Sequence, residues 1–328
     1  MKVPNAARAA LVLCIITPMS AAAQQGANFD VPRWAFPNTA PTVVAPKPPF
    51  DSVIALRVPN SARTFTLAQV KNQLNPPDWF PASHTQAPDV VLHARPAAKY
   101  GCGFCHLPNG QGRSENATIV GLPSAYFIRQ VTDLGSGARH SAVTGWGPSV
   151  RMGEVALATT HDEAVEAARY FGAMRAQARY AVVERTTIPV TYEASGLYAA
   201  KPGVDSEPLA SRLIEMSNDI ERHELRDAGE TFTTFVPVGS IARGRRIAVS
   251  APAKAATRCA TCHGMDLRGI GVVPPIAGRS PAYVLRQLIG FRTGARTSTT
   301  SAPMQIVTAQ LQLDDMIAVS AYAGSRKP

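Results

Sequence analysis

Two short stretches of this chain share one pattern of cysteine and histidine, CGFCH at residues 102–106 and CATCH at residues 259–263. In each stretch two cysteines lie three positions apart, and a histidine directly follows the second cysteine. Positions i, i+3 and i+4 share one face of a helix, so both cysteines and the histidine can face a single object. The chain is therefore expected to form two sites of the same kind.

The sequence that follows each stretch is an internal repeat. From the histidine to a glycine is 15 residues in both copies, His106 to Gly121 and His263 to Gly278. The segments GLPSAYFIRQ and GRSPAYVLRQ then align without a gap and lead to the tripeptide GAR in each copy. This alignment matches Tyr126 with Tyr283 and Gln130 with Gln287. Two copies of one domain explain the shared distances.

A methionine follows the GAR tripeptide in each copy, Met152 in the first and Met304 in the second. The first copy has five extra residues before its methionine. A pair of acidic residues then lies at the same offset in both copies, and a tyrosine follows each methionine after 18 residues. Acidic side chains are favourable at a helix N-terminus, so each copy is expected to close with a helix. Ser280 or Ser124 is expected to cap the helix in the aligned segment and Ser240 a short helix before CATCH, whereas Met265 and Met316 are expected to fill the core.

Covalent haem is the use of the motif that explains every residue in it. Two sulfurs can form thioethers with the two vinyl groups, and the histidine can bind iron from the same side. A zinc site would need cysteine pairs about 15 to 20 residues apart or further histidines, and a redox pair of thioredoxin type leaves the histidine unexplained. A disulfide within each stretch would be strained. The sequence predicts two covalent haem c groups at Cys102, Cys105, His106, Cys259, Cys262 and His263.

On these residues both copies resemble class I c-type cytochrome domains, and the arrangement resembles exported dihaem cytochromes c. The resemblance covers about residues 96–176 and 239–326. It implies a mostly α-helical fold with two tandem cytochrome c domains, in which a methionine from a loop before the last helix is the second iron ligand. The implied iron ligands are His106 and Met152 in the first copy and His263 and Met304 in the second.

The remaining sequence predicts export and two regions outside the repeat. Residues 1–23 resemble a signal peptide cleaved near Gln24, because Lys2 and Arg8 precede a short apolar run and an Ala-rich site. The expected order is then a proline-rich, extended arm, the first cytochrome domain, a partly irregular linker packed on the domains, and the second cytochrome domain. These parts span 24–95, 96–178, 179–238 and 239–328. In the arm, one helix is expected from Thr66 to Leu74, with a capping box at Thr66, and in the linker a helical turn is expected in SRLIEM, residues 211–216.

Haem with histidine and methionine ligands leaves no open iron position and favours the reduced state, so it passes electrons. The sequence predicts a periplasmic electron-transfer protein, not an enzyme, with a redox donor and a redox acceptor protein as partners. An electron-transfer subunit of a dehydrogenase complex is an alternative. A dihaem peroxidase is another: it needs one iron with an open or displaceable sixth position, and His84 and His93 upstream of the first motif leave it open. Among the histidines outside the motifs, His140 is the first alternative to methionine as an iron ligand.

The predicted compartment excludes a nucleic-acid partner, and the hydropathy pattern excludes a transmembrane segment in the mature chain. The formal net charge is +10, but export excludes nucleic acid as the partner of this basic chain. After the signal peptide, no apolar run approaches the roughly 20 residues that span a bilayer, so no transmembrane segment is expected in the mature chain.

Overall fold

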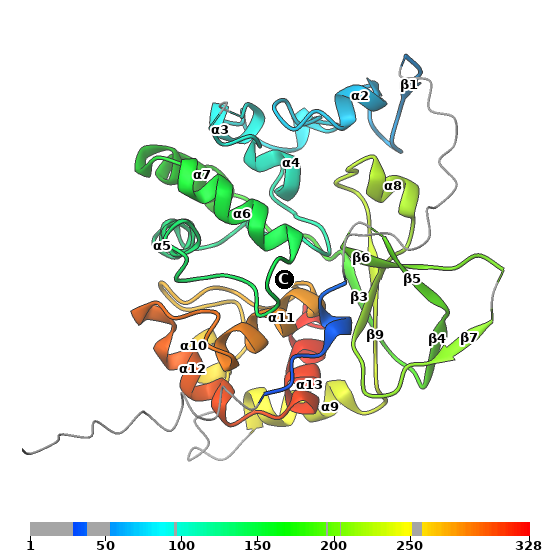
Figure 1. Cartoon of the computed structure of the whole chain (residues 1–328), viewed down its shortest axis with the longest axis vertical. Helices are drawn as coiled ribbons and strands as arrows, with labels where there is room; N and C mark the ends of the chain where they lie inside the picture. The colour runs from blue at the N-terminus through cyan, green and yellow to red at the C-terminus, as the bar shows by residue number, and fades with distance from the viewer. Residues whose placement is uncertain (1–28, 38–52, 95–96, 195, 204, 251–257) are drawn as a thin grey trace, which may run out of the picture.

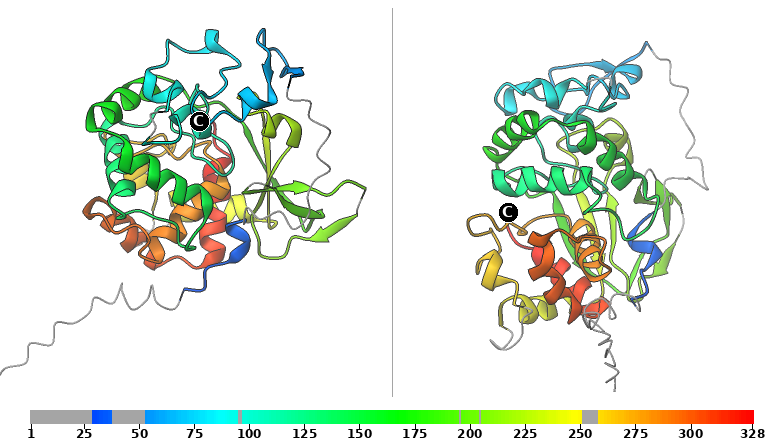
Figure 2. Two further views of the ribbon diagram at one scale, coloured as in Figure 1. Left: turned by 45° about the horizontal axis from the view of Figure 1, so that its top comes forward. Right: turned by 60° about the vertical axis from the view of Figure 1, so that its left-hand side comes forward.

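The computed structural model describes residues 29–37, 53–94, 97–194, 196–203, 205–250 and 258–328. The predicted signal peptide and its cleavage site lie outside these residues. Residues 53–94 of the arm, the first copy of the repeat and the second copy are stacked in this order, and a β-sheet lies beside both copies (Figures 1 and 2). Residues 29–37 of the arm pack against the second copy instead. Within the described residues, no helix has both the length and the apolar character needed to cross a membrane.

The first copy consists of helices, as the repeat predicted. Their bounds are α4 Cys102–His106, α5 Ser124–Gly135, α6 Gly147–Ala158 and α7 His161–Gly172. Thr160 caps α7, and its hydroxyl and the Glu163 carboxylate satisfy the first backbone N–H groups of the helix. The core between α5 and α7 contains Phe127 and Phe171. The acidic pair predicted at the start of the closing helix lies in its first turn.

The second copy repeats this arrangement with one added helix at its start. Its helices are α9 Ser240–Arg245, a π-helical turn at Arg246–Ser250, α10 Ala260–His263, α11 Pro281–Arg292, a 3-10 turn at Thr299–Ser301, α12 Ala302–Ala309 and α13 Leu313–Gly324. The predicted cap is confirmed at Ser280, whose hydroxyl accepts from Tyr283 N at 3.0 Å. It is wrong at Ser240, whose hydroxyl donates backward to the Pro237 carbonyl. It is also wrong at Ser124, which lies inside α5 after the N-cap residue Pro123.

Helices α9 and α13 cross very closely in the second copy. A Cβ atom on Gly244 of α9 would lie 2.0 Å from the Ala318 carbonyl oxygen of α13. A side chain cannot fit there, so the crossing requires glycine at this position.

The linker is partly irregular, as predicted, but much of it forms a sheet with strand order β3-β9-β8-β6-β5. The elements are β3 Tyr180–Glu184, β4 Thr187–Pro189, β5 Thr191–Ala194, β6 Leu197–Ala200, β7 Ser206–Pro208, β8 Ile214–Ser217, α8 Ile220–Glu224 and β9 Phe232–Val236, with β4 and β7 paired separately. Along β9 every second side chain is buried, the alternation of a strand with one face against a core. The predicted helical turn in SRLIEM is therefore wrong, since its second half is strand β8.

The linker packs on both copies, as expected. Strands β3 and β9 contact α13 of the second copy. On the other side, the Arg226 guanidinium donates to the Phe104 carbonyl of the first copy and lies 3.5 Å from the centroid of the Phe104 ring.

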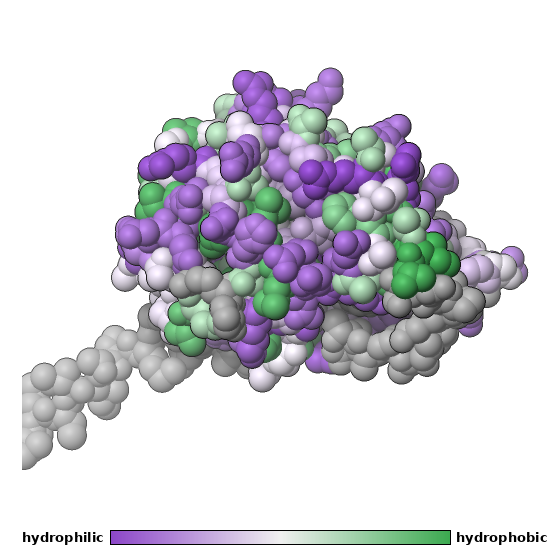
Figure 3. Space-filling view, turned by 90° about the horizontal axis from the view of Figure 1, so that it is seen from above, coloured by the Kyte–Doolittle hydropathy of each residue, from purple (hydrophilic) through white to green (hydrophobic). Residues whose placement is uncertain are grey.

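The described part of the arm is folded rather than extended. Its elements are a 3-10 turn at Arg33–Ala35, β1 Ala55–Leu56, β2 Phe65–Thr66, α2 Leu67–Val70, a 3-10 turn at Pro81–Ser83 and α3 Asp89–Leu92. A small core joins Val58, Val70 and Trp79 to Leu225 of the linker. The predicted capping box of Thr66 is present, but the helix ends at Val70 and leaves Leu74 46% exposed. Seen from the arm, the surface is mostly hydrophilic with small separate hydrophobic patches (Figure 3).

Candidate haem-binding sites

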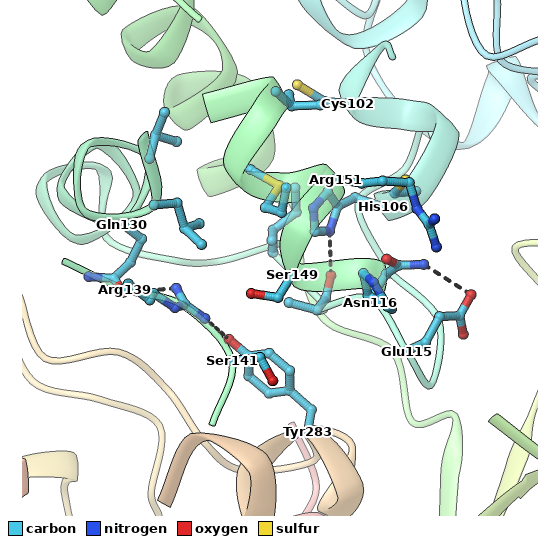
Figure 4. A pocket seen from close by; sticks show the side chains of 18 of the residues that line it. Cys102, His106, Glu115, Asn116, Gln130, Arg139, Ser141, Ser149, Arg151 and Tyr283 are labelled. Atoms are coloured by element: carbon cyan, nitrogen blue, oxygen red, sulfur yellow. Dashed lines mark hydrogen bonds between the residues drawn. The ribbon is translucent and has the colours of Figure 1, made fainter. Parts of the chain in front are cut away.

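The first motif opens onto a cavity between the two copies. Helix α4 places Cys102, Cys105 and His106 along its wall, and α6 contributes Met152 (Figure 4). About 1490 Å³ inside this cavity is free of protein atoms, open solvent included. The four side chains predicted to hold the first haem c thus face one cavity.

The histidine of each motif is held by the same hydrogen bond. His106 Nδ1 lies 2.8 Å from the Ala117 carbonyl oxygen, and His263 Nδ1 lies 2.8 Å from the Pro274 carbonyl oxygen. Since a carbonyl only accepts, Nδ1 carries the proton and Nε2 keeps its lone pair for a metal. Burial also lowers the pKa of both imidazoles, which favours the neutral form that binds iron.

Burial disfavours the thiolate at three of the motif cysteines, Cys102, Cys105 and Cys259. It raises the pKa of Cys102 to about 12 and that of Cys259 to about 11, and none of the described cysteines forms a disulfide. A thioredoxin-like pair needs the opposite, a thiolate favoured by a lowered pKa. Among the residues that the structure describes, no three His, Cys, Asp or Glu side chains form a metal-binding group. The structure therefore gives no support to the zinc and redox-pair alternatives.

The two methionines lie on helices rather than in the predicted loops. Met152 is in the middle of α6, and Met304 is in the first turn of α12. The five extra residues of the first copy precede Met152 and lie partly inside α6, which is 12 residues long where α12 has eight. Met152 reaches the cavity beside His106, whereas Met304 packs against the core of the second copy. Iron ligation by either methionine stays a prediction.

The second motif is more open than the first. Cys262 is exposed, although His263 is only 8% exposed. The loop after α10 carries three exposed hydrophobic side chains, Met265, Ile270 and Val272. Met265 is 68% exposed, so the expectation that it fills the core is wrong.

The cavity ends at a polar cluster to which both copies contribute equivalent side chains (Figure 4). Arg139 donates to Gln130 Oε1 at 2.8 Å, to Gln287 Oε1 at 2.9 Å and to Tyr283 Oη at 3.0 Å. Arg296 donates to the same two amides, at 2.6 Å to Gln130 and 3.1 Å to Gln287. The two arginines also pair through an antiparallel backbone bridge. The copies thus meet through a symmetric contact.

Sequence reasoning assigned no role to this cluster, although the repeat had matched its members. The strict recurrence of Tyr, Gln and Arg at equal spacing was the signal that could have found it. The electrostatics show a strongly positive site: burial raises the pKa of Tyr283, but Arg139 and Arg296 lower it by more. Buried guanidinium groups whose hydrogen bonds go to neutral amide and phenol oxygens favour an anion beside them.

The other histidines considered as iron ligands lie in different surroundings. His140 lines the cavity but is exposed, and its Nδ1 bonds the Ser141 carbonyl at 2.9 Å. His84 lies outside this cavity, between Tyr170 Oη at 2.9 Å and the Asp78 carboxylate at 3.4 Å. His93 bonds Asn75 at 2.9 Å in the arm. Both arm histidines thus have protein partners away from the first motif.

No model of a protein family matches this chain. A cytochrome c4 of Azotobacter vinelandii is 26% identical over 226 residues, which cover 67% of this chain and 82% of that protein. The cytochrome subunit of sulfide dehydrogenase of Chlorobaculum tepidum is 51% identical over 41 residues, 12% of this chain and 37% of the relative. The thiosulfate dehydrogenase electron acceptor of Stutzerimonas stutzeri is 42% identical over 69 residues, 20% of this chain and 31% of the relative.

The chain spans about a third of the length of these last two relatives. The crystal structure of reduced cytochrome c4 from Pseudomonas stutzeri superposes on 69% of this chain and covers 93% of its own, with 19% identity and a TM-score of 0.45. Together with the two haem-attachment motifs, the sequence relatives support covalent haem c and electron transfer as the chemistry of this chain.

Proposed function

We propose that this chain is an exported dihaem c-type cytochrome that carries electrons between two redox proteins. The observation that carries this proposal is the first cavity, where a CxxCH helix, an Nε2 lone pair and a methionine face one space. Bound haem would supply a one-electron Fe(III)/Fe(II) couple there. The protein supplies attachment, ligands and burial, and these set the potential.

In each copy the two cysteines would attach the haem and the histidine would bind iron through Nε2. These residues are Cys102, Cys105 and His106 in the first copy and Cys259, Cys262 and His263 in the second. Met152 and Met304 would supply the second iron ligand in the two copies. A thioether there raises the potential and leaves no coordination position for substrate, which favours a carrier over a peroxidase.

The polar cluster between the copies fits the carboxylate groups that a haem carries on one edge. Arg139 and Arg296 hold two positive charges in a buried place, and their hydrogen bonds go to neutral oxygens. A haem carboxylate beside them would neutralise charge that is otherwise costly to bury. Both copies contribute to the cluster, so it would hold haem and also join the copies.

A dehydrogenase partner is the second candidate context for the same chemistry. Two relatives are named as a dehydrogenase subunit and a dehydrogenase electron acceptor. The folded arm and the linker sheet add surface that electron transfer by the two haem domains alone does not require. In this reading the chain passes electrons within a periplasmic complex.

Intact-mass spectrometry of the protein from a strain that attaches haem c tests the proposal. The expected mass is the chain cleaved near Gln24 plus two haem groups that survive acid extraction. The Cys259→Ala/Cys262→Ala double variant, which lacks both thioether positions of the second motif, is expected to retain only one covalently attached haem. A wild-type chain with one haem or none would overturn the assignment, and a native-mass measurement from the source cell separates a free carrier from a complex subunit.

A further inference from the structure

A buried histidine of the linker lies beside the first cavity, between two carboxylates. His223 of α8 has an exposed fraction of 0%. Its Nδ1 is 2.9 Å from Glu230 Oε1, and its Nε2 is 3.6 Å from Glu115 Oε1. Glu115 in turn lines the cavity that contains His106. One side chain therefore separates His223 from the space assigned to the first haem.

The charges in direct contact with His223 favour a proton on its ring. Arg113 bonds the His223 carbonyl at 2.9 Å and lies 3.2 Å from Glu115. Arg113, Glu115 and Glu230 together carry one net negative charge, which a proton on His223 balances. Burial and Arg113 lower the pKa of His223, but Glu115 and Glu230 raise it by more, so the net pKa lies above its usual value.

The other charged groups around the histidine are engaged elsewhere. On α8 and the turn that follows it, Arg222 pairs with Asp227 at 2.6 Å, and Arg226 bonds the Phe104 carbonyl. Glu224 of the same helix is exposed. Before β3, Arg179 bonds the Glu230 carbonyl at 2.7 Å. The two carboxylates that contact His223 thus decide its protonation.

Three polar atoms of this cluster are buried without a hydrogen-bond partner among the described residues, namely His223 Nε2, Glu115 Oε2 and Arg113 Nε. Buried polar groups are nearly always satisfied, so an exception in a charged cluster points to a role in binding. Here the exception is a ring nitrogen that faces a carboxylate beside the cavity.

We propose that His223 is a redox-linked proton-binding site of the first haem. When one electron from the donor protein reduces the first iron, one proton from water binds His223 Nε2, and oxidation releases both. The physical reason is charge: reduction removes one positive charge from a buried space next to Glu115, which strengthens proton binding at low dielectric. Linkage makes the effect reciprocal, so a bound proton raises the affinity of that iron for its electron.

This proposal rests on the proposed function, and its first test needs no variant. In the wild-type protein with two haems, the His223 ring is titrated by NMR in the fully oxidised and fully reduced states. Proton affinity should be higher in the reduced state, where a tenfold difference corresponds to 59 mV for one electron. Equal affinities in the two states would overturn the proposal while leaving the dihaem assignment intact. A chain without haem would instead refute the proposed function.

The second test measures the potential of each haem between pH 5 and 9. The first haem is assigned through Met152→His, which should lower only its potential. Its potential should fall as pH rises in the wild type and become much less dependent on pH in His223→Gln. The control is His161→Gln, an exposed histidine on α7, which should keep the wild-type slope. If the potential of the first haem depends on pH as steeply in folded His223→Gln as in the wild type, the proposal is contradicted, because haem carboxylates would then account for the pH dependence.

Discussion

Replacement of Glu215 by alanine should destabilise the whole protein, because this carboxylate joins its three main parts. Glu215 lies on β8 of the linker and is 3% exposed. Its Oε1 accepts from the hydroxyls of Ser114 in the first copy and Ser280 in the second, each at 2.7 Å. Its Oε2 accepts from Thr234 of β9 at 2.9 Å.

The size of the effect follows from these partners. Each buried donor left without its acceptor costs about 1–3 kcal/mol, and removal of one partner from a buried charged network typically costs about 3–5 kcal/mol. Burial raises the pKa of Glu215, which shows that its own desolvation offsets part of the gain from the hydroxyls. We therefore expect a loss of about 3–5 kcal/mol, not the sum over all donors. At about 2–4 °C per kcal/mol, Tm should fall by about 6–20 °C.

Thermal unfolding of the two-haem protein, followed by circular dichroism, measures this loss. Glu215→Gln keeps one acceptor oxygen and should lose less than Glu215→Ala. Glu166→Ala, at an exposed position of α7, should stay within about 0.5 kcal/mol of the wild type. If Glu215→Ala unfolds within 1 °C of Glu166→Ala, the carboxylate does not hold the three parts together.

Three further predictions follow from the helix crossing, the methionines and the buried carboxylate. Gly244→Ala should lower the free energy of unfolding in urea by at least about 1–3 kcal/mol. Gly153→Ala on α6 should not lower it, because a Cβ atom there would lie 3.8 Å from its nearest neighbour, the Leu134 carbonyl oxygen. Met304→Ala should remove half of the sulfur-to-iron absorption of the oxidised protein, and exposed Met265→Ala should leave it unchanged. Burial raises the pKa of Glu115, but Arg113 and His223 lower it by more. The stability that the Glu115 carboxylate contributes is therefore fully present above about pH 4.3, the ordinary pKa of glutamate. It is lost as the pH falls toward the lowered pKa of Glu115 in the folded protein. The unfolding free energy of Glu115→Gln should then fall less than that of the wild type from pH 6 to pH 3.

Each of the three has a result that would contradict it. Equal urea midpoints for the two glycine variants would mean that α9 and α13 separate at no cost. A full sulfur-to-iron band in Met304→Ala would make that methionine a core residue. Parallel stability curves for Glu115→Gln and the wild type would place the acid sensitivity in other carboxylates.

The sequence was informative where structure depends on local spacing. The helices of both copies and the caps at Thr66 and Ser280 are present as predicted, because each depends on residues within one or two turns. The methionines were placed correctly along the repeat but assigned to loops. Spacing fixes a position in the chain, whereas the conformation there depends on packing against α5 and α11.

The linker sheet and the core of the arm were not predictable in this way. Strand β3 pairs in parallel with β9, which lies about fifty residues later in the chain. Trp79 of the arm donates to the Leu225 carbonyl, 146 residues away. The buried face of the sheet also includes the polar residues Glu215 and Thr234. The alternation of hydrophobic and polar residues that would predict these strands is therefore interrupted where the sheet meets the two copies. Interactions over such separations leave no local pattern.

The symmetric contact between the copies has the geometry of a two-fold homodimer within a single chain. In a true homodimer, equivalent residues must be identical, so a change on one side of the interface is repeated on the other. Here Arg139 and Arg296 are encoded separately, and only the first copy has the five-residue insertion before its methionine. The two haem environments can therefore diverge while their contact stays paired. With the proposed haems bound, such divergence would let two sites of common origin hold electrons at unequal energies and would give transfer through the molecule a direction.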